Sequence, residues 1–239
     1  WLAVSYKTRP EVVDEVERLA GAPPSLNYVN ARCRFFHSRP RLGESYIWQA
    51  YRKLFENAER EIIVCNGYFI PSADFVETVR EAVARGVRVI LLTDSPDTND
   101  LPELSMVGRG YYKKILAINE EIDVKRSGGS VQVWEWFGWR YDREQRTEGS
   151  LHAKYAVFDR RYSLVGSYNL DPRSEKLNSE TAVVFESEKL STDLARMFYE
   201  NDLAYSRRVT AHDANEYQDP ADALYKLRKE FGGLFESLL

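Results

Sequence analysis

The sequence contains only two cysteines, Cys33 and Cys65, in 239 residues. They are too few for a disulfide framework and lack the paired C-x-x-C spacing of a structural zinc site. No apolar run reaches the roughly 20 residues that cross a bilayer, and no positively charged leader opens the chain. The first residue is Trp1 rather than methionine. We therefore expect a soluble or peripheral piece of a longer parent, without a metal or cofactor.

Excess positive charge is also absent. Lys and Arg number 33 against 37 Asp and Glu, which gives a net charge of −4 and a pI of about 5.6. The chain as a whole therefore has no positive field to attract a nucleic-acid backbone, although a local basic patch could still form. Hydrophobic residues make up 44% of the chain, which is enough for a packed globular domain. Nucleic acid is not the partner that we expect.

Three regions follow from the composition along the chain. Residues 1–42 include an arginine-rich segment, and we interpret them as a connecting segment or the tail of a missing N-terminal half. Residues 43–210 alternate between apolar runs and helical patterns and should form the main domain. Residues 211–239 end in ADALYKLRKEFGGLFESLL, which predicts a C-terminal amphipathic helix extension.

The main region predicts alternating strands and helices. The apolar runs EIIVCNGYF (61–69) and VRVILLT (87–93) flank the helical pattern DFVETVREAVARG (74–86). This order predicts a strand–helix–strand unit with a buried parallel pair. Further strands are expected at 131–137 and 179–187, and helices at 110–122 and from about 190 to 205. We expect an α/β fold, a layered α/β/α domain with a central mixed β-sheet.

A predicted hairpin carries polar side chains in otherwise apolar strands. Its sequence is SLHAKYAVFDRRYSLVGSYNLD, with His152 and Lys154 in the first strand and Ser167 and Asn169 in the second. A two-residue turn would place His152 opposite Asn169 and Lys154 opposite Ser167. Four polar side chains would then share one face. A turn with an odd number of residues would send Ser167 and Asn169 to the other face.

The turn of this hairpin has an unusual composition. Arg160 and Arg161 fill the two positions that a tight turn would use. Tight hairpin turns favour Gly, Asn and Asp, so Arg-Arg is poor turn chemistry.

The polar groups of the hairpin suit a phosphate. An imidazole, an ammonium, a hydroxyl and an amide, without a cage of thiolates or carboxylates, fit an anionic tetrahedral group better than a metal ion. Lys154, Ser167 and Asn169 can bind phosphoryl oxygens while His152 attacks phosphorus. Glu180, on the next strand, could hold the other ring nitrogen of His152 and fix its tautomer. Each residue alone also has a structural interpretation, and the combination favours a catalytic site.

The spacing of these residues resembles a known signature. The pattern H-x-K, four residues, D, six residues, G-S-x-N is formed by His152, Lys154, Asp159, Gly166, Ser167 and Asn169. It resembles the HKD motif of the phospholipase D superfamily. The following LDPRS and LNSE make the segment similar to bacterial cardiolipin synthases, especially the C-type branch. The resemblance covers roughly residues 40–190 and implies a phosphohistidine intermediate on His152, supported by Asp159 and Glu180.

Two other segments resemble pocket segments of the same branch. They are NGYFIPS and TDSPDTNDLP, and they imply substrate-pocket roles for Asn66, Tyr68, Phe69, Asn99 and Asp100. The segment SMVGRGYY departs from the branch because it lacks a histidine there. The resemblance implies a phospholipid substrate such as phosphatidylglycerol, and a peripheral membrane or cytoplasmic location in a bacterium.

A second catalytic motif is missing from the sequence. Phosphodiester cleavage needs a nucleophile on one side of phosphorus and a proton donor for the leaving oxygen on the other. His37 and His212 are not followed by any G-S-x-N. The chain is therefore either the C-terminal half of a two-motif enzyme or a single-motif protein that forms a homodimer. The alternatives to a phosphatidyltransferase or hydrolase are a homodimeric phospholipase D-type nuclease and a non-catalytic phosphate-binding domain.

Overall fold

The computed structural model describes residues 29–140, 144–147, 149–217 and 219–222. The contacts divide the chain into two units, residues 1–30 and residues 31–239, and the second unit contains all the elements described below. The expected C-terminal helix lies almost entirely outside the described residues. Within the described residues, no helix is long and apolar enough to span a bilayer.

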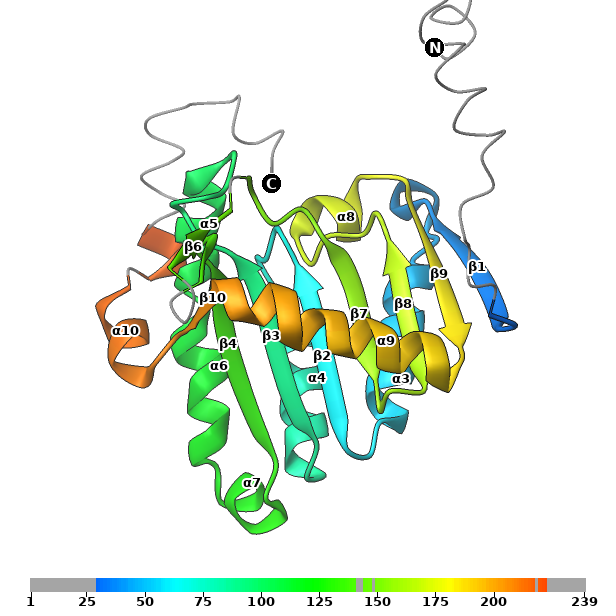
Figure 1. Cartoon of the computed structure of the whole chain (residues 1–239), viewed down its shortest axis with the longest axis horizontal. Coiled ribbons are helices and arrows are strands. Elements are labelled where there is room, and N and C mark those ends of the chain that lie inside the picture. The colour runs from blue at the N-terminus through cyan, green and yellow to red at the C-terminus, as the bar shows by residue number, and fades with distance from the viewer. Residues whose placement is uncertain (1–28, 141–143, 148, 218, 223–239) are drawn as a thin grey trace, which may run out of the picture. The chain divides into compact units, whose positions relative to one another are not determined.

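An eight-stranded mixed sheet forms the centre of the second unit (Figure 1). Its order is β1-β9-β8-β7-β2-β3-β4-β10, in which β2, β3 and β4 are parallel neighbours and the other pairs are antiparallel. A small second sheet pairs β5 with β6. The strands are β1 (Arg32–Ser38), β2 (Glu61–Asn66), β3 (Arg88–Asp94), β4 (Ser130–Trp136), β5 (Trp139–Arg140), β6 (Gln145–Arg146), β7 (Lys154–Phe158), β8 (Tyr162–Gly166), β9 (Glu180–Glu186) and β10 (Ser206–Arg208).

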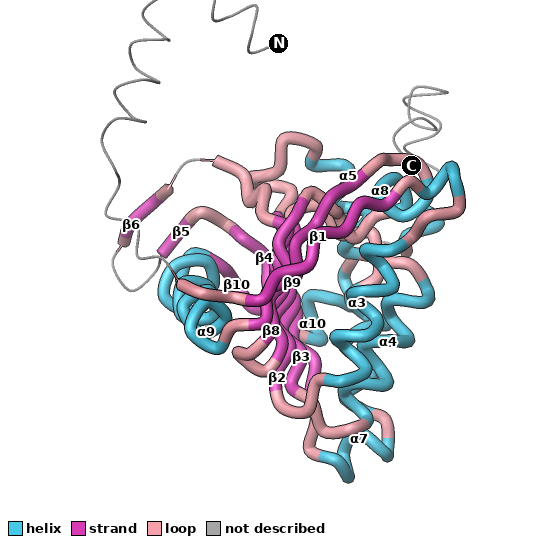
Figure 2. The backbone as a smooth tube through the Cα atoms, turned by 90° about the vertical axis from the view of Figure 1, so that its right-hand side faces the viewer, coloured by secondary structure: helices cyan, strands magenta, loops and turns pink. Residues whose placement is uncertain are grey.

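Helices cover both faces of this sheet. The α-helices are α3 (Tyr46–Asn57), α4 (Ala73–Ala84), α5 (Pro102–Arg109), α6 (Tyr112–Ala117), α7 (Ile122–Ser127), α8 (Pro172–Lys176), α9 (Glu188–Met197) and α10 (Ala211–Glu216). The shorter helical turns are η1 (Pro40–Leu42), η2 (Ile118–Glu120), η3 (Phe198–Asp202) and η4 (Leu203–Tyr205). Figure 2 shows the sheet edge-on, with α9 on one side and α3, α4 and α7 on the other. The predicted layered α/β/α fold with a mixed sheet is confirmed.

The alternation of side chains along β2 explains the two layers. Every residue of β2 is buried. Ile62 and Val64 belong to the core that includes α3 and α4, whereas Ile63 and Cys65 belong to the core that includes α9. Because successive side chains of a strand point to opposite faces, a continuous apolar run is what a strand covered on both sides requires.

Two expectations about the ends and turns of the sheet are wrong. Part of the expected connecting segment forms β1, an edge strand that pairs with β9. The β7–β8 turn has three residues rather than two, since Phe158 pairs with Tyr162 and Tyr155 with Val165. Asp159 and Arg160 adopt φ values of 53° and 55° there, which is turn geometry that the composition alone did not indicate.

Candidate active site

His152 and Lys154 of the HKD motif lie at the end of the sheet where β2 and β3 finish and β7 begins. Asn66, the last residue of β2, pairs with Lys154, the first residue of β7. His152 comes two residues earlier and is exposed. The α5 and α8 helices lie at this end of the sheet (Figure 1). Loops that follow the carboxyl ends of parallel strands are where α/β proteins usually place their ligands.

Tyr68 connects the histidine to the lysine. Its ring meets the His152 ring edge-on, with centroids 5.7 Å apart. The Lys154 Nζ lies 5.6 Å from the centroid of the same ring and donates a hydrogen bond to the carbonyl oxygen of His152 at 2.9 Å. The Tyr68 hydroxyl donates to Asp100 Oδ1 at 2.5 Å. The His152 ring and the Lys154 ammonium group thus both lie against Tyr68.

The environment of Lys154 is partly dry and contains nearby acids. Burial lowers the pKa of Lys154, and the negative charges of Asp171, Glu180 and Asp100 offset part of that effect. A cation surrounded by carboxylates, with few hydrogen bonds of its own, is able to bind a phosphoryl group without large reorganisation.

The position of Asn169 depends on a buried asparagine. Asn66 Nδ2 donates to the carbonyl oxygen of Tyr168 at 3.1 Å, and Asn66 Oδ1 accepts from the N–H of Leu170 at 3.1 Å. Asn66 therefore fixes both neighbours of Asn169. In the described part of the chain, Asn169 Oδ1 is buried without a hydrogen-bond partner. An unpartnered buried polar atom is costly, and a bound group that donates a hydrogen bond to this oxygen, such as an alcohol hydroxyl, would satisfy it.

Glu180 belongs to the site but has partners that the sequence did not suggest. Its carboxylate accepts hydrogen bonds from Ser167 Oγ, from Ser174 Oγ at 3.0 Å and from Asn178 Nδ2 at 3.3 Å. Within the described residues, no hydrogen bond joins Glu180 to the His152 ring. Glu180 thus holds Ser167 and the start of α8 in place, and it adds negative charge near Lys154.

The polar residues converge by a route other than the one expected. The predicted cross-strand register is wrong because of the three-residue turn. The chain leaves β8 after Gly166, and a parallel bridge between Phe69 and Leu170 draws the next segment toward the end of β2. Ser167 and Asn169 therefore reach the site by leaving the strand, not by facing Lys154 across it.

Asp159 is not brought to this site. It follows the last residue of β7, at the opposite end of the strand from His152. Its carboxylate accepts hydrogen bonds from the backbone N–H groups of Glu59, Arg60 and Glu61 at 2.8 to 2.9 Å. The structure therefore gives Asp159 a scaffolding role, which ties the hairpin to the start of β2.

The residues expected to line a substrate pocket separate into two groups. Tyr68 lies at the site against the His152 ring, and Asp100 accepts a hydrogen bond from the Tyr68 hydroxyl. Phe69 packs against Phe75 in the core. Asn99 is buried and bonds Ser105 Oγ and the N–H of Leu101. Asn99 and Phe69 thus support the loops rather than line the site.

Two acidic residues near the site were not identified from the sequence. Burial raises the pKa of Asp94 to about 7, although Thr98 and the N–H of Leu151 donate to it. Burial also raises the pKa of Asp171, despite the hydrogen bond from the N–H of Ser174. The available signals were an acid at the end of an apolar strand and an Asp–Pro pair that starts a helix.

A glycine allows the two sides of the site to approach each other. A Cβ on Gly67 would lie 2.2 Å from the carbonyl oxygen of Leu151 and 3.2 Å from the Cα of His152. No side chain fits there without moving the backbone that carries His152. The residue after Asn66 is therefore restricted to glycine by close packing.

The comparison with known proteins agrees with this geometry. Residues 51–202 match the family model described as "Cardiolipin synthase, PLD-like domain". Cardiolipin synthase B of Shigella flexneri is 34% identical over 134 residues, which cover 56% of this chain and 27% of that protein. The chain thus spans about a quarter of the length of this curated relative.

Two solved structures share the fold. Phosphatidylserine synthase of Haemophilus influenzae superposes with a TM-score of 0.62 at 15% identity, over 87% of this chain and 46% of that one. The phospholipase D family member Nuc of Salmonella typhimurium superposes with a TM-score of 0.51 at 18% identity, over 75% of this chain and 99% of that one.

Since the family match covers well over half of the chain, the class of protein is established as the phospholipase D superfamily. Within it, the chain belongs to the family of cardiolipin synthase-type, phospholipase D-like domains.

Proposed function

We propose that this domain transfers a phosphatidyl group between alcohols of phospholipid metabolism, or hydrolyses the phospholipid when water is the acceptor. The observation that carries this proposal is the convergence of exposed His152, partly buried Lys154 and Asn169 at one end of the sheet. The similarity to cardiolipin synthase B supports phosphatidylglycerol or a similar lipid as the substrate.

The reaction would proceed in two displacements at phosphorus. An imidazole nitrogen of His152 forms a bond to phosphorus as the bond to the leaving alcohol oxygen breaks, and that oxygen takes up a proton. An acceptor alcohol or water then attacks phosphorus, loses its proton and releases the histidine. Lys154 and the Asn169 amide would stabilise the negative charge on the phosphoryl oxygens in both steps.

The proton donor would come from a second motif. We propose that this motif is supplied by another segment of a longer chain or by a second copy of this domain, with residues 43–210 as the catalytic region. An exposed apolar strip that runs from β8 to the edge strand β1 supports such a partner. Phe35, Val183 and Val165 are directly paired across β1, β9 and β8, and the first and last are 65% and 42% exposed.

Charge around the site favours a lipid phosphate over a nucleic-acid strand. Asp94, Asp100, Asp171 and Glu180 all lie close to the HKD residues. A polyanionic strand would need a run of basic contacts along its backbone, whereas a single phosphodiester needs only the local donors. The fold shared with Nuc keeps a nuclease as the second candidate, to be distinguished by substrate.

The experiment is His152→Ala in the protein assembled with its second motif. We expect turnover of phosphatidylglycerol to fall by at least about 10³-fold, because the nucleophile that attacks phosphorus is lost. The thermal melt should be unchanged because the side chain is exposed. His212→Ala, which removes an exposed histidine on α10, is the matched control. Near-normal activity of His152→Ala, or equal loss in both variants, would refute the proposal.

The same assay tests the other candidates. Turnover of single-stranded DNA but not of phospholipid would identify a nuclease, and binding without turnover of either would identify a phosphate-binding domain. Among the described residues, no three His, Cys, Asp or Glu side chains are grouped as a metal site would require, so we expect activity to survive chelation by EDTA.

A further inference from the structure

The backbone on both sides of His152 is attached to the ends of two neighbouring strands. The carbonyl oxygen of Ala153 accepts a hydrogen bond at 2.9 Å from the N–H of Gly67, which directly follows β2. The N–H of Leu151 donates to Asp94 Oδ2 at 3.1 Å, and Asp94 is the last residue of β3. The first attachment joins two backbone groups, whereas the second depends on a single side chain.

The Asp94 carboxyl group is buried and held in one orientation. Its residue is only 1% exposed, and a buried carboxyl group needs hydrogen-bond partners. Thr98 Oγ1 bonds Asp94 Oδ1 and also lies 3.0 Å from the carbonyl oxygen of Trp136. The loop after β3 and the end of β4 thus fix one carboxyl oxygen of Asp94, and the other is left to accept from the N–H of Leu151.

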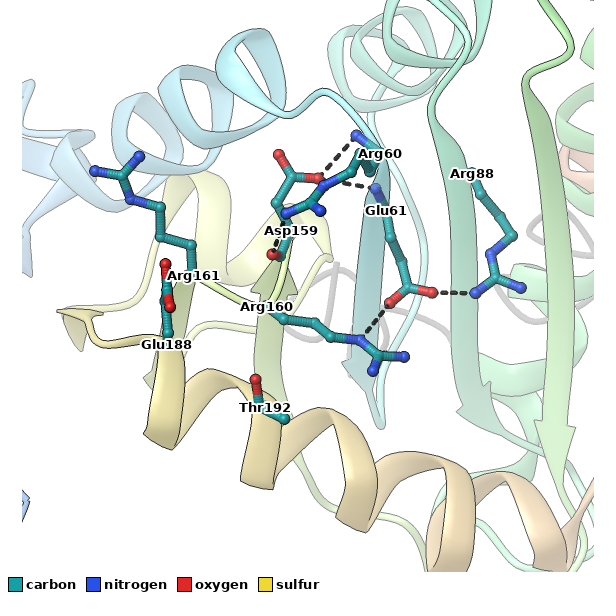
Figure 3. Close-up of a pocket in the computed structure, with 8 residues that line it drawn as sticks. All are labelled: Arg60, Glu61, Arg88, Asp159, Arg160, Arg161, Glu188 and Thr192. Atoms are coloured by element: carbon teal, nitrogen blue, oxygen red, sulfur yellow. Dashed lines mark hydrogen bonds and ion pairs between the residues drawn. The ribbon is translucent and has the colours of Figure 1, made fainter.

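The other end of the sheet has an acid that makes the same kind of contact. Asp159 accepts hydrogen bonds from the backbone N–H groups of residues 59–61, at the start of β2 (Figure 3). Those contacts tie a turn to a strand. The N–H that Asp94 binds belongs instead to the residue directly before His152. The position of its partner therefore connects Asp94 to the HKD site.

The segment that carries His152 is closely packed. The carbonyl oxygen of Leu151 would lie 2.2 Å from a Cβ on Gly67, and the Leu151 side chain is buried in the core that includes α9. The His152 ring contacts the Tyr68 ring edge-on. Because a reacting group must be aligned with the atom that it attacks, a displacement of about 1 Å can lower the rate about 10²-fold. Turnover should therefore be sensitive to any change in the attachment of Leu151.

We propose that Asp94 is a positioning residue for His152, which orients the imidazole toward phosphorus by accepting a hydrogen bond from the N–H of Leu151. The proposal rests on the proposed function of His152 as the group that attacks phosphorus. Since Asp94 is 1% exposed, it acts through the backbone and not by contact with the substrate. This role differs from the contact with the His152 ring that the sequence predicted for Glu180.

The charge of Asp94 is not required for this role. Burial raises the pKa of Asp94 to about 7, so both protonation states occur near neutral pH. In either state one oxygen can accept from the N–H of Leu151. Asparagine matches the neutral acid, because its amide oxygen can accept from Leu151 while its NH₂ group donates to Thr98 Oγ1, whose own hydroxyl can donate to Trp136. Alanine removes both contacts. Comparison of Asp94→Asn with Asp94→Ala therefore separates the hydrogen bond from the charge.

The first test measures kcat and KM for phosphatidylglycerol in the protein assembled with its second motif. We expect Asp94→Ala to lower kcat by about 10- to 100-fold, with KM changed by less than about threefold, because the lost contact aligns the imidazole and does not bind the lipid. Asp94→Asn should keep kcat within about threefold of the wild type.

A matched control removes a similar side-chain contact with the backbone at the opposite end of the sheet. Asn119 bonds the N–H of Val131 at 2.8 Å and its carbonyl oxygen at 2.9 Å, near the start of β4. Asn119→Ala should lower stability but leave kcat of the folded protein unchanged. If Asp94→Ala does not fold, Asp94→Ser takes its place, since the serine hydroxyl is one bond too short to reach Leu151, and the same result is expected.

The second test does not require turnover. Nuclear magnetic resonance of the full chain follows hydrogen exchange at the Leu151 amide and the contact between the His152 and Tyr68 rings, with His37 and His212 as reference signals. In Asp94→Ala we expect exchange at Leu151 to be at least about tenfold faster and the ring contact to weaken. Asp94→Asn and Asn119→Ala should resemble the wild type in both respects.

The outcomes distinguish this role from a structural one. Wild-type kcat in Asp94→Ala, an equal loss of kcat in Asn119→Ala, or an equal loss in Asp94→Asn would overturn the proposal. An unchanged His152 ring signal in Asp94→Ala would also overturn it. If the wild type does not turn over phosphatidylglycerol, the proposed function fails, and the exchange and ring signals still decide whether Asp94 holds His152 in place.

Discussion

The two ends of the central sheet use charge in opposite ways. At the HKD end, the single lysine of the motif is surrounded by the carboxylates of Asp171, Glu180 and Asp100, and burial lowers its pKa. At the other end, exposed arginines surround carboxylates that are already bound. The first arrangement favours exact placement of one cation against one phosphate. The second joins the hairpin turn to the starts of β2 and β3 through ion pairs.

The two ends of the sheet are also held in place by different kinds of contact. Buried side chains fix the HKD end: Asn66 bonds the backbone on both sides of Asn169, and Ser174 donates to Glu180. At the turn, the backbone N–H groups of residues 59–61 bind Asp159, and the arginines extend outward. Changes at the HKD end should therefore alter turnover, and changes at the turn should alter stability.

Among the variants that compare the two ends of the sheet, Lys154→Ala is expected to lower turnover the most. Loss of the ammonium removes a preorganised charge from a partly dry phosphate site, and we expect turnover to fall by about 10²- to 10³-fold. The melting temperature should stay close to that of the wild type, because burial disfavours the charged form. Lys176→Ala, at an exposed lysine of α8, is the control. Equal losses in the two variants would mean that Lys154 has no special role.

Much of this organisation could be predicted from the sequence. The continuous apolar runs of β2 and β3 indicated strands buried on both faces, and the helical pattern between them indicated the crossover helix α4. The motif spacing placed His152 and Lys154 at the same end of the sheet because they are only two residues apart in the chain. These features depend on local periodicity, which the sequence shows directly.

Features that depend on tertiary contacts could not be predicted. The turn has three residues because Asp159 binds the backbone of residues 59–61, about 100 positions away in the chain. The residues of the edge strand β1 gave no clear burial pattern, as only Ser38 is buried among them. Asp94 gave no sign that burial would raise its pKa to about 7. Such long-range contacts override local preference.

A smaller effect is expected for Asp94, whose contribution to the free energy of unfolding depends on pH. Its pKa is about 7 in the folded protein, against about 3.9 in an unfolded chain. The folded state therefore holds the proton more tightly, so the stability contributed by this group is complete below about pH 4 and is lost as pH rises to about 7. Asp94→Asn cannot ionise. From pH 5 to pH 8 we expect the variant to gain about 1–3 kcal/mol relative to the wild type.

The measurement for Asp94 is urea unfolding at pH 5 and pH 8. Asp97→Asn, which changes an exposed acid in the same loop, should show no such dependence. If the free energy of unfolding depends on pH in the same way in both variants, the assignment of a raised pKa to Asp94 is wrong.

The smallest change in the free energy of unfolding is expected for Asp159→Asn. This variant tests directly whether the turn end of the sheet has no part in catalysis. Asn tolerates the positive φ of this turn and keeps one carbonyl oxygen, but it cannot bind all three backbone N–H groups with a carboxylate. We expect Asp159→Asn to lower the free energy of unfolding by about 1 kcal/mol, as loss of a capping carboxylate does. Turnover of the folded enzyme should remain within about threefold of the wild type, since no catalytic group is touched. Unfolding in urea and turnover at saturating lipid measure the two quantities separately. If turnover instead falls by a hundredfold with stability unchanged, the third residue of the HKD signature acts in catalysis, and the division of roles between the two ends of the sheet is wrong.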